Sequence, residues 1–357
     1  MHLVFLIHDI YYVGGTERVV VNMANDLVEK GYQVTILSLS RFRPSNIFTI
    51  DSRVVIDFLN FNFENVFNIP QKIISILRVG FYFRKYTSQT VVLGIGIYPS
   101  LILALMPKKS NIKTIGCQHI SFAFHKHVWS FLRKISFHRL DAVVSLTEQD
   151  LPKLKKLNQN TFVIPNSVSF FPHEPAKLEN KIILTIGRMV YNKGYDFLLD
   201  IFEKLTHSHP DWTLRIIGEG QLKESIILRV EASGLKDRVE ILPPTNLIMS
   251  QYLQASVYLM TSRTEGLPMV LLEAQACGLP IVSFNCETGP SDIISNGKDG
   301  YLVDCFNVDE MAEKLAVLCS YPDKRKEFGV NGRENIKRFL PEEITNKWEM
   351  LFRKIIQ

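Results

Sequence analysis

The chain has 357 residues, of which 46% are hydrophobic and 22% are charged, and its formal net charge is +5. This composition is typical of a globular protein and excludes a disordered one, and the length suits two domains of ordinary size. The five cysteines are odd in number and form no C-x-x-C pair, so neither a disulfide framework nor a zinc site is indicated, and a reducing compartment fits.

Two apolar stretches bear on membrane insertion. Residues 3–7 are too few for the apolar region of a signal peptide. Residues 91–107 form an uncharged run near the lower length limit of a transmembrane helix, with Pro99 inside it. We interpret this run as a buried strand followed by a helix, because strands of parallel sheets also read as continuous apolar runs.

The N-terminal half begins in the manner of a parallel α/β domain. Residues 2–8 predict a strand, and a helix follows with Thr16 as its N-cap and Gly31 after its last turn. Further strands are predicted at residues 34–39, 91–97, 113–117 and 141–146. The alternation of strand and helix predicts a parallel sheet.

The first strand-to-helix loop carries Gly14 and Gly15. Backbone N–H groups at a helix N-terminus form a natural seat for phosphate. The loop matches neither G-x-G-x-x-G nor the P-loop with its lysine, so dinucleotide binding and ATP hydrolysis are not supported. A plain tight turn is the alternative, because paired glycines are common in turns.

His119 directly follows the strand predicted at 113–117. The carboxyl end of a parallel strand is where open α/β sheets bind ligands, and an imidazole can hydrogen-bond a sugar or a phosphate. A structural role is the alternative, and the same region also holds His125, His127 and His138.

After a proline-containing linker at residues 169–180, the α/β pattern starts again. Residues 181–187 predict a strand, and a helix begins from Gly194. Arg188 and Lys193 lie in the loop between them, where a guanidinium fork and an ammonium group suit a diphosphate. Solvated surface charges are the alternative interpretation.

The stretch from Ser262 to Val282 predicts a short buried helix. Pro268 suits the first helical position, and Gly278 suits the position after the last turn. Glu273 lies in the middle of this apolar helix and therefore needs partners. Glu265 stands just before the helix, where the neighbouring Gly266 lets a ligand approach the backbone. The alternative is a structural carboxylate that bonds a neighbouring loop.

These motifs resemble the retaining glycosyltransferases of family 4, which have the GT-B fold. The resemblance rests on Glu265-x7-Glu273 within TEGLPMVLLEAQACGLPIV, and on GGTERVV, IPNSV, GRMVYNKG, TGPSDII and GKDGYLV, so it spans nearly the whole chain. It implies an α/β fold with two Rossmann-like domains whose parallel sheets face a central cleft. The implied parts are an acceptor-binding domain (1–168), a nucleotide-sugar-binding domain (169–340) and a C-terminal helix (341–357) that crosses back to the first domain.

The same resemblance assigns roles to individual residues. It places Glu265 and His119 against the transferred sugar, and Glu273 against the ribose hydroxyls. It places Arg188 and Lys193 against the diphosphate as it leaves. The remaining donor-binding positions implied are Gly14, Gly15, Gly266, Leu267 and Pro268.

The implied reaction is transfer of a hexose or N-acetylhexosamine from a nucleotide sugar, with UDP favoured, and with retention of the anomeric configuration. The sequence contains no Asp-x-Asp, so we expect no metal and no cofactor, with Arg188 and Lys193 replacing Mg²⁺. The family usually has a glycine where Pro243 stands, and this departure leaves the nucleotide base open.

Charge is distributed unevenly along the chain. Between Glu64 and Asp141 there are eleven cations and no acidic residue: Lys72, Arg78, Arg84, Lys85, Lys108, Lys109, Lys113, Lys126, Arg133, Lys134 and Arg139. The interval also holds the aromatic residues Phe81, Tyr82, Phe83, Tyr86, Phe122, Phe124, Trp129, Phe131 and Phe137. An anionic membrane interface fits this pattern better than single-stranded nucleic acid does, and a solvated basic face over core aromatics is the alternative.

We therefore expect a cytoplasmic enzyme, peripheral on the inner face of the cell membrane, that binds no nucleic acid. Its acceptor would be a glycan on a polyprenyl diphosphate, in the biosynthesis of a bacterial surface polysaccharide or glycan. Two other functions stay open. An epimerase on the same fold would turn over the donor without an acceptor, and a non-catalytic basic module would not need Glu273 or Arg188.

Overall fold

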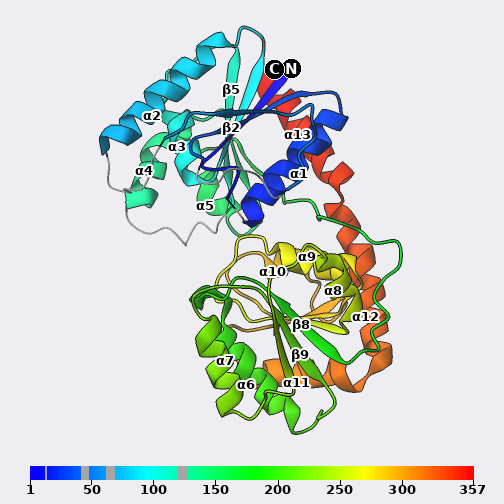
Figure 1. Ribbon diagram of the computed structural model, residues 1–357. Helices are drawn as coiled ribbons and strands as arrows, with labels where there is room; N and C mark the ends of the chain where they lie inside the picture. Colours follow the sequence, from blue (N-terminus) through cyan, green and yellow to red (C-terminus); the bar gives the residue numbers. More distant parts are fainter. Residues whose placement is uncertain (13, 42–47, 62–68, 120–127) are drawn as a thin grey trace. The chain divides into compact units, whose positions relative to one another are not determined.

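The computed structural model describes the chain except residues 13, 42–47, 62–68 and 120–127. The described residues form two compact units, 1–167 with 341–357 and 168–340. Each unit is built on one parallel sheet with helices on both faces (Figure 1). The predicted fold class, with two Rossmann-like domains of the GT-B type, is confirmed. The segment predicted as a linker, 169–180, lies within the second unit.

The first sheet has seven strands. Their order is β3 (Val55–Phe58), β2 (Gln33–Ser38), β1 (His2–Ile7), β4 (Thr90–Ile95), β5 (Ile112–Gln118), β6 (Ala142–Ser145) and β7 (Thr161–Val163). All neighbouring pairs are parallel, so the strands end at one shared edge. That edge carries the loops after β1 and β5, which hold the glycine pair and His119.

Helices cover both faces of this sheet. One core cluster joins it to α1 (Gly15–Glu29) and α13 (Pro341–Ile356), whose Ile344, Trp348, Leu351 and Phe352 are buried. The opposite cluster joins it to α2 (Ile69–Tyr82), α3 (Ile97–Leu105), α4 (Val128–Ser136), α5 (Leu151–Lys155) and the 3₁₀ turns Phe83–Lys85 and Phe137–Arg139. The C-terminal helix thus completes the core of the first unit.

The apolar run at 91–107 forms β4 and α3, both of which are buried in this core. The interpretation as a strand and a helix is therefore confirmed. In the described part of the chain, no helix combines the length and the apolar character that a bilayer span requires.

The second sheet has six parallel strands. Their order is β10 (Val239–Leu242), β9 (Thr213–Ile217), β8 (Ile182–Ile186), β11 (Val257–Met260), β12 (Ile281–Phe284) and β13 (Gly300–Val303). The largest core cluster lies on the face covered by α6 (Tyr195–Thr206), α7 (Lys223–Ala232) and α11 (Val308–Ser320). The unit also contains α8 (Ile248–Gln254), α9 (Met269–Ala276), α10 (Pro290–Ile293), α12 (Pro322–Asn335) and the 3₁₀ turn Ile336–Phe339.

Two predicted helix starts are wrong by a small margin. Gly14, with φ −151° and ψ 171°, is the N-cap of α1, whereas Thr16 lies in the first turn. Pro268, with ψ 103°, is the N-cap of α9 rather than its first residue. Glycine serves well as an N-cap, and the fixed φ of proline suits both positions, so neither choice is decided by the local sequence. Gly278 lies after the C-cap of α9 with φ 76°, as predicted.

Candidate functional site

The loop between β8 and α6 carries the two cations of the second unit. It turns through a 3₁₀ helix at Tyr191–Lys193 and enters α6 through Gly194, whose φ of 67° is left-handed. A Cβ at Gly194 would lie 2.0 Å from the carbonyl oxygen of Thr261, so only glycine allows this approach. The Thr261 hydroxyl donates to the carbonyl oxygens of Lys193 and Gly194, at 3.2 and 2.9 Å. The loop is thereby fixed beside the end of β11.

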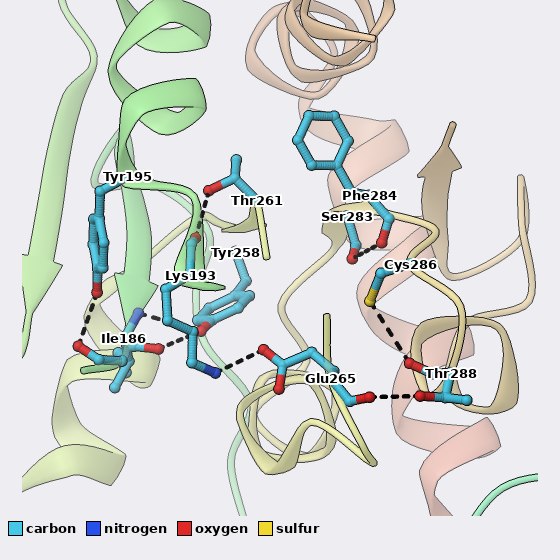
Figure 2. Close-up of polar contacts among 11 residues, drawn as sticks. Ile186, Lys193, Tyr195, Tyr258, Thr261, Glu265, Ser283, Phe284, Cys286 and Thr288 are labelled. Carbon is cyan, nitrogen blue, oxygen red and sulfur yellow. Dashed lines mark hydrogen bonds and ion pairs between the residues drawn. The ribbon is translucent and has the colours of Figure 1, made fainter. Parts of the chain in front are cut away.

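Lys193 and Glu265 form an ion pair across 72 positions of the chain. Lys193 Nζ lies 2.6 Å from Glu265 Oε1 (Figure 2). The two side chains are 25% and 12% exposed, so water screens the pair less than it screens a surface pair. Arg188, at the start of the same loop, is exposed to solvent. Lys193, predicted to contact the diphosphate, and Glu265, predicted to contact the sugar, are therefore neighbours in this unit.

The segment after β12 supports the backbone around Glu265. The hydroxyl of Thr288 donates to the Glu265 carbonyl oxygen at 2.5 Å (Figure 2). Gly289 has φ 99°, and a Cβ there would lie 2.4 Å from the carbonyl oxygen of Gly266 and 2.5 Å from Pro268 Cδ. Leu267 is buried. The TGPSDII segment thus packs directly under the loop that presents Glu265.

Arg263 ties the two loops of this site together. Its backbone N–H donates to Asn192 O at 2.8 Å, and its guanidinium donates to Tyr191 O at 2.8 Å. The same guanidinium donates bidentate hydrogen bonds to the carboxylate of Asp196, at 2.9 and 2.5 Å. It also lies 4.0 Å from the centre of the Tyr191 ring. Arg263 therefore holds the loop of Lys193 in register with the loop of Glu265.

Glu273 lies in α9 and is 1% exposed. The Tyr252 hydroxyl of α8 donates to its Oε2 atom at 3.0 Å. The Tyr252 ring stacks on Tyr258, with ring centres 5.8 Å apart. A carboxylate can accept several hydrogen bonds at once, so one that accepts from Tyr252 can also accept from a ligand, such as ribose hydroxyls. Glu273 can therefore keep its hydrogen bond with Tyr252 and bind a ligand at the same time.

The glycine pair of the first unit lies where β1 gives way to α1. The first N–H groups of an α-helix have no partner within the helix, so they can receive an anion. Among the described residues, nothing lies within 4 Å of a Cβ built at Gly15. A Cβ at Gly14 would lie 2.5 Å from Glu17 Oε2. An anion approaching Gly14 would therefore displace the flexible Glu17 side chain.

His119 follows β5 at the same edge of the first sheet. Among the described residues, its Nδ1 atom is buried without a hydrogen-bond partner, and burial lowers the pKa of the ring to about 4. The imidazole is therefore neutral at physiological pH, with one donor and one acceptor nitrogen. His119 lines a cavity of about 20 Å³ with α1 and α13, which has room for one water and not for a sugar.

Gln118, the last residue of β5, is a second buried polar side chain at this edge. It is 6% exposed, and neither atom of its amide has a hydrogen-bond partner in the described part of the chain. Leaving such a group unsatisfied costs roughly 1–3 kcal/mol. Successive side chains alternate between the faces of a strand, so Gln118 and His119 project to opposite sides of the sheet.

The site residues thus fall into two groups, each within its own unit. Lys193 and Glu265 touch each other, and Glu273 occupies the helix that follows Glu265. Gly14, Gly15 and His119 share the carboxyl edge of the first sheet. No role was predicted for the supporting residues Tyr252, Arg263 and Thr288, nor for the unpartnered Gln118. Thr288 lay in a recognised motif, whereas the contacts of Tyr252 and Arg263 join residues distant in the chain, which local patterns do not reveal.

The described residues contain no group of three or more His, Cys, Asp or Glu side chains arranged to hold a metal ion.

Comparison with known proteins matches two family models to successive parts of the chain. The description "Glycosyltransferase Family 4" matches residues 13–170, and "Glycosyl transferases group 1" matches residues 169–335. The two matches meet at the boundary between the units.

Three similar curated proteins come from bacteria. An uncharacterized glycosyltransferase of Haemophilus influenzae is 32% identical, over 97% of this chain and 98% of its own. The amylovoran biosynthesis glycosyltransferase AmsD of Erwinia amylovora is 31% identical, with coverage of 97% and 98%. A Campylobacter jejuni protein is 27% identical and covers 96% of both chains. Its name is GalNAc-alpha-(1->4)-GalNAc-alpha-(1->3)-diNAcBac-PP-undecaprenol alpha-1,4-N-acetyl-D-galactosaminyltransferase.

Among solved structures, TarM of S. aureus is similar to this fold. A mutant of TarM, in complex with Fondaparinux, alpha-GlcNAc-glycerol and UDP, has a TM-score of 0.81 and 19% identity. The match covers 99% of this chain and 100% of TarM.

Proposed function

The chain belongs to glycosyltransferase family 4 and has the GT-B fold, and on that premise we propose that it transfers a hexose or N-acetylhexosamine from a UDP-sugar to a glycan acceptor. The acceptor is a glycan carried on a polyprenyl diphosphate, and the product belongs to a bacterial surface polysaccharide or glycan. The presence of UDP in the TarM complex supports the choice of nucleotide. The undecaprenol in the Campylobacter relative's name supports the choice of acceptor.

The ion pair between Lys193 and Glu265 is the observation that carries this proposal. Breaking the bond between the anomeric carbon and the phosphate oxygen develops negative charge on the diphosphate. A preorganised ammonium beside that charge stabilises the transition state more than the ground state. Arg188, exposed at the start of the same loop, adds a second cation. With these two charges in place, the reaction proceeds without a metal ion.

Glu265 positions the sugar in this proposal and is not its nucleophile. The acceptor hydroxyl attacks the anomeric carbon on the face from which the diphosphate leaves, and its proton passes to the departing phosphate. The new glycosidic bond thus keeps the configuration of the donor. The neutral His119, which is only half-buried, hydrogen-bonds a sugar hydroxyl from outside the one-water cavity that it lines, and Glu273 binds the ribose.

The test is release of the nucleoside diphosphate (UDP or GDP) from a panel of UDP-galactose, UDP-glucose, their N-acetylamino forms and GDP-mannose, with and without acceptor glycolipids from a bacterial membrane. We expect acceptor-dependent release with one UDP-sugar, retained in the presence of EDTA, and an α-linkage in the product by NMR. Conversion of the donor without acceptor would support the epimerase alternative. Absence of turnover with every donor would contradict the proposal.

A further inference from the structure

The structure divides the basic and aromatic interval 65–140 into core and surface. Phe83, Tyr86 and Phe137 are buried, whereas Phe81 and Phe131 are 69% and 62% exposed. Arg133 is fully buried and contributes no surface charge. The side chains of Lys72, Phe122, Phe124 and Lys126 lie outside the described residues. Part of the aromatic content of this interval therefore belongs to the core, as the alternative interpretation had it, and only the exposed side chains are left for a membrane interface.

What remains on the surface is concentrated on α2. Ile73, Ile74, Leu77 and Phe81 are between 46% and 69% exposed, and we call these four residues the α2 stripe. Their spacing of three to four residues places them on one side of the helix. The opposite side of α2 is anchored, because Val79 is buried in the core and Ser75 Oγ lies 2.8 Å from the Tyr98 hydroxyl. The stripe is thus a fixed part of the surface.

The α2 stripe borders a groove with a basic rim. The groove lies between α2 and the turn after α3, and its lining includes Leu77, Phe81, Arg84, Pro107 and Lys108. The Arg84 guanidinium lies 5.3 Å from the centre of the Phe81 ring. Lys109 Nζ donates to the carbonyl oxygen of Tyr86 at 2.6 Å, which fixes the turn against the end of α2. Apolar side chains and cations therefore alternate over one contiguous area.

We infer that the α2 stripe and its basic rim dock on the surface of an anionic lipid bilayer. Scattered exposed apolar residues are normal, but a contiguous apolar patch marks an interaction surface. The occupant follows from charge, because residues 65–140 contain no carboxylate and the rim presents cations to phosphate headgroups. Apolar side chains flanked by Lys and Arg are the pattern of interfacial helices. The α4 helix, on the same face of the sheet, adds the exposed Phe131, Lys134 and Ile135.

This inference rests on the proposed function in one respect, since a lipid-linked acceptor is presented at a bilayer. Docking through the first unit would keep the enzyme at its acceptor while the donor arrives from solution.

The experiment is sedimentation of the full chain with vesicles of phosphatidylcholine alone or mixed equally with phosphatidylglycerol. We expect binding to the mixed vesicles that weakens as salt increases, and at least tenfold weaker binding in the double variant Leu77→Glu/Phe81→Glu. The control Leu228→Glu/Val330→Glu makes the same charge change at residues of the second unit that are 66% and 70% exposed. It should stay within about twofold of the unchanged chain, because neither residue belongs to the proposed docking surface.

A second variant, Arg84→Gln/Lys108→Gln, keeps the stripe and removes two rim charges. Each cation near an anionic surface contributes about fivefold to partitioning, so about a 25-fold loss is expected on mixed vesicles.

Calorimetric titration with UDP separates this inference from the proposed function. UDP binding without vesicle binding would overturn the docking inference alone, and failure to bind UDP would overturn the proposed function. Vesicle binding that is equal in the stripe variant and its control would also overturn the docking inference. So would binding to a single-stranded oligonucleotide, or a stripe-dependent dimer in light scattering, if either occurred without vesicle binding.

Discussion

At the carboxyl edge of the second sheet, Lys193 and Glu265 are bonded to each other and Glu273 accepts from Tyr252. At the carboxyl edge of the first sheet, Gln118 and Nδ1 of His119 have no hydrogen-bond partner among the described residues. The side chains at the second edge are therefore held in place by contacts within the protein. The first edge holds buried polar groups whose desolvation no contact among the described residues compensates. We infer that the second edge supplies most of the donor contacts, through Lys193, Glu265 and Glu273, and that the first edge adds the contact of His119 with the sugar.

The largest effect that would test this contrast is expected from Glu265→Gln. Loss of the carboxylate removes the partner of Lys193 and the proposed contact with the sugar, so turnover should fall by about 10²–10³-fold. Affinity for UDP should stay within about threefold, because UDP carries no sugar in that position. Turnover is measured as UDP release and affinity by calorimetry.

Glu224→Gln, which alters an exposed carboxylate of α7, is the matched control and should leave both quantities unchanged. Near-normal turnover in Glu265→Gln would contradict the assignment of the second edge.

Glu273→Gln tests the buried carboxylate at almost constant volume. We expect UDP to bind about 10- to 100-fold more weakly, because a charge-assisted hydrogen bond becomes a neutral one. Tyr252→Phe, which removes the hydroxyl that holds Glu273, should weaken binding by about three- to tenfold. Calorimetric titration measures both. Unchanged affinity in both variants would show that Glu273 is a structural carboxylate.

His119 tests the first edge through pH. Burial lowers its pKa to about 4 in the folded chain, against 6.5 for an unperturbed His. The unfolded state therefore binds the proton first, and folding stability is lost as the pH falls from 6.5 toward 4. The expected loss between pH 7 and pH 4.5 is roughly 2–3 kcal/mol. Urea unfolding of the unchanged chain and of His119→Gln at pH 7 and pH 4.5 measures it.

The stability difference between the two proteins should change by that amount in favour of His119→Gln at the lower pH. A difference that does not vary with pH would mean that His119 titrates as an exposed group does.

The smallest effect is expected from Arg263→Lys, which sharpens the claim that the second edge is preorganised. An ammonium cannot make the two-pronged contact with Asp196 and also reach Tyr191 O, so the loop of Lys193 should lose register. We expect kcat to fall by about three- to tenfold with little change in KM, because loop geometry matters most in the transition state.

Arg238→Lys is the matched control, because the Arg238 guanidinium donates to the carbonyl oxygens of Trp212 and His209, which lie outside both loops of the site. An equal fall of kcat in both variants would show that the effect of Arg263 is general to the unit.

The sequence predicted the architecture well, since alternating strands and helices and the glycines at turns are local signals. The buried helix around Glu273 and the strand and helix at 91–107 were read correctly from apolar patterning. The N-cap of the first helix was predicted wrongly, because Gly14 and Thr16 are both residue types that can begin a helix. The sequence also did not predict which aromatic residues of the basic interval are buried. Their burial depends on which helices and strands pack against each other.

The sequence proposes the candidate site as separate residues, and the structure adds the contacts among them. Glu265 and Glu273 are proposed from their spacing, and Arg188 and Lys193 from their loop. The partner of Glu273 is Tyr252, 21 residues earlier, and the partner of Glu265 is Lys193, 72 residues earlier. Pairings over such distances are set by the order of strands in the sheet, which the local sequence does not encode.

The central claim is that the second unit binds a nucleotide through Glu273. The most direct test is the melting temperature of the full chain with UDP, GDP, CMP and NAD, for the unchanged protein and for Glu273→Gln. A ligand that binds only the folded state at 100 times its Kd stabilises it by about 2.7 kcal/mol, which is readily measured as a shift. We predict a shift with UDP that is strongly reduced in Glu273→Gln. No shift with any nucleotide, or an equal shift in both proteins, would contradict the account.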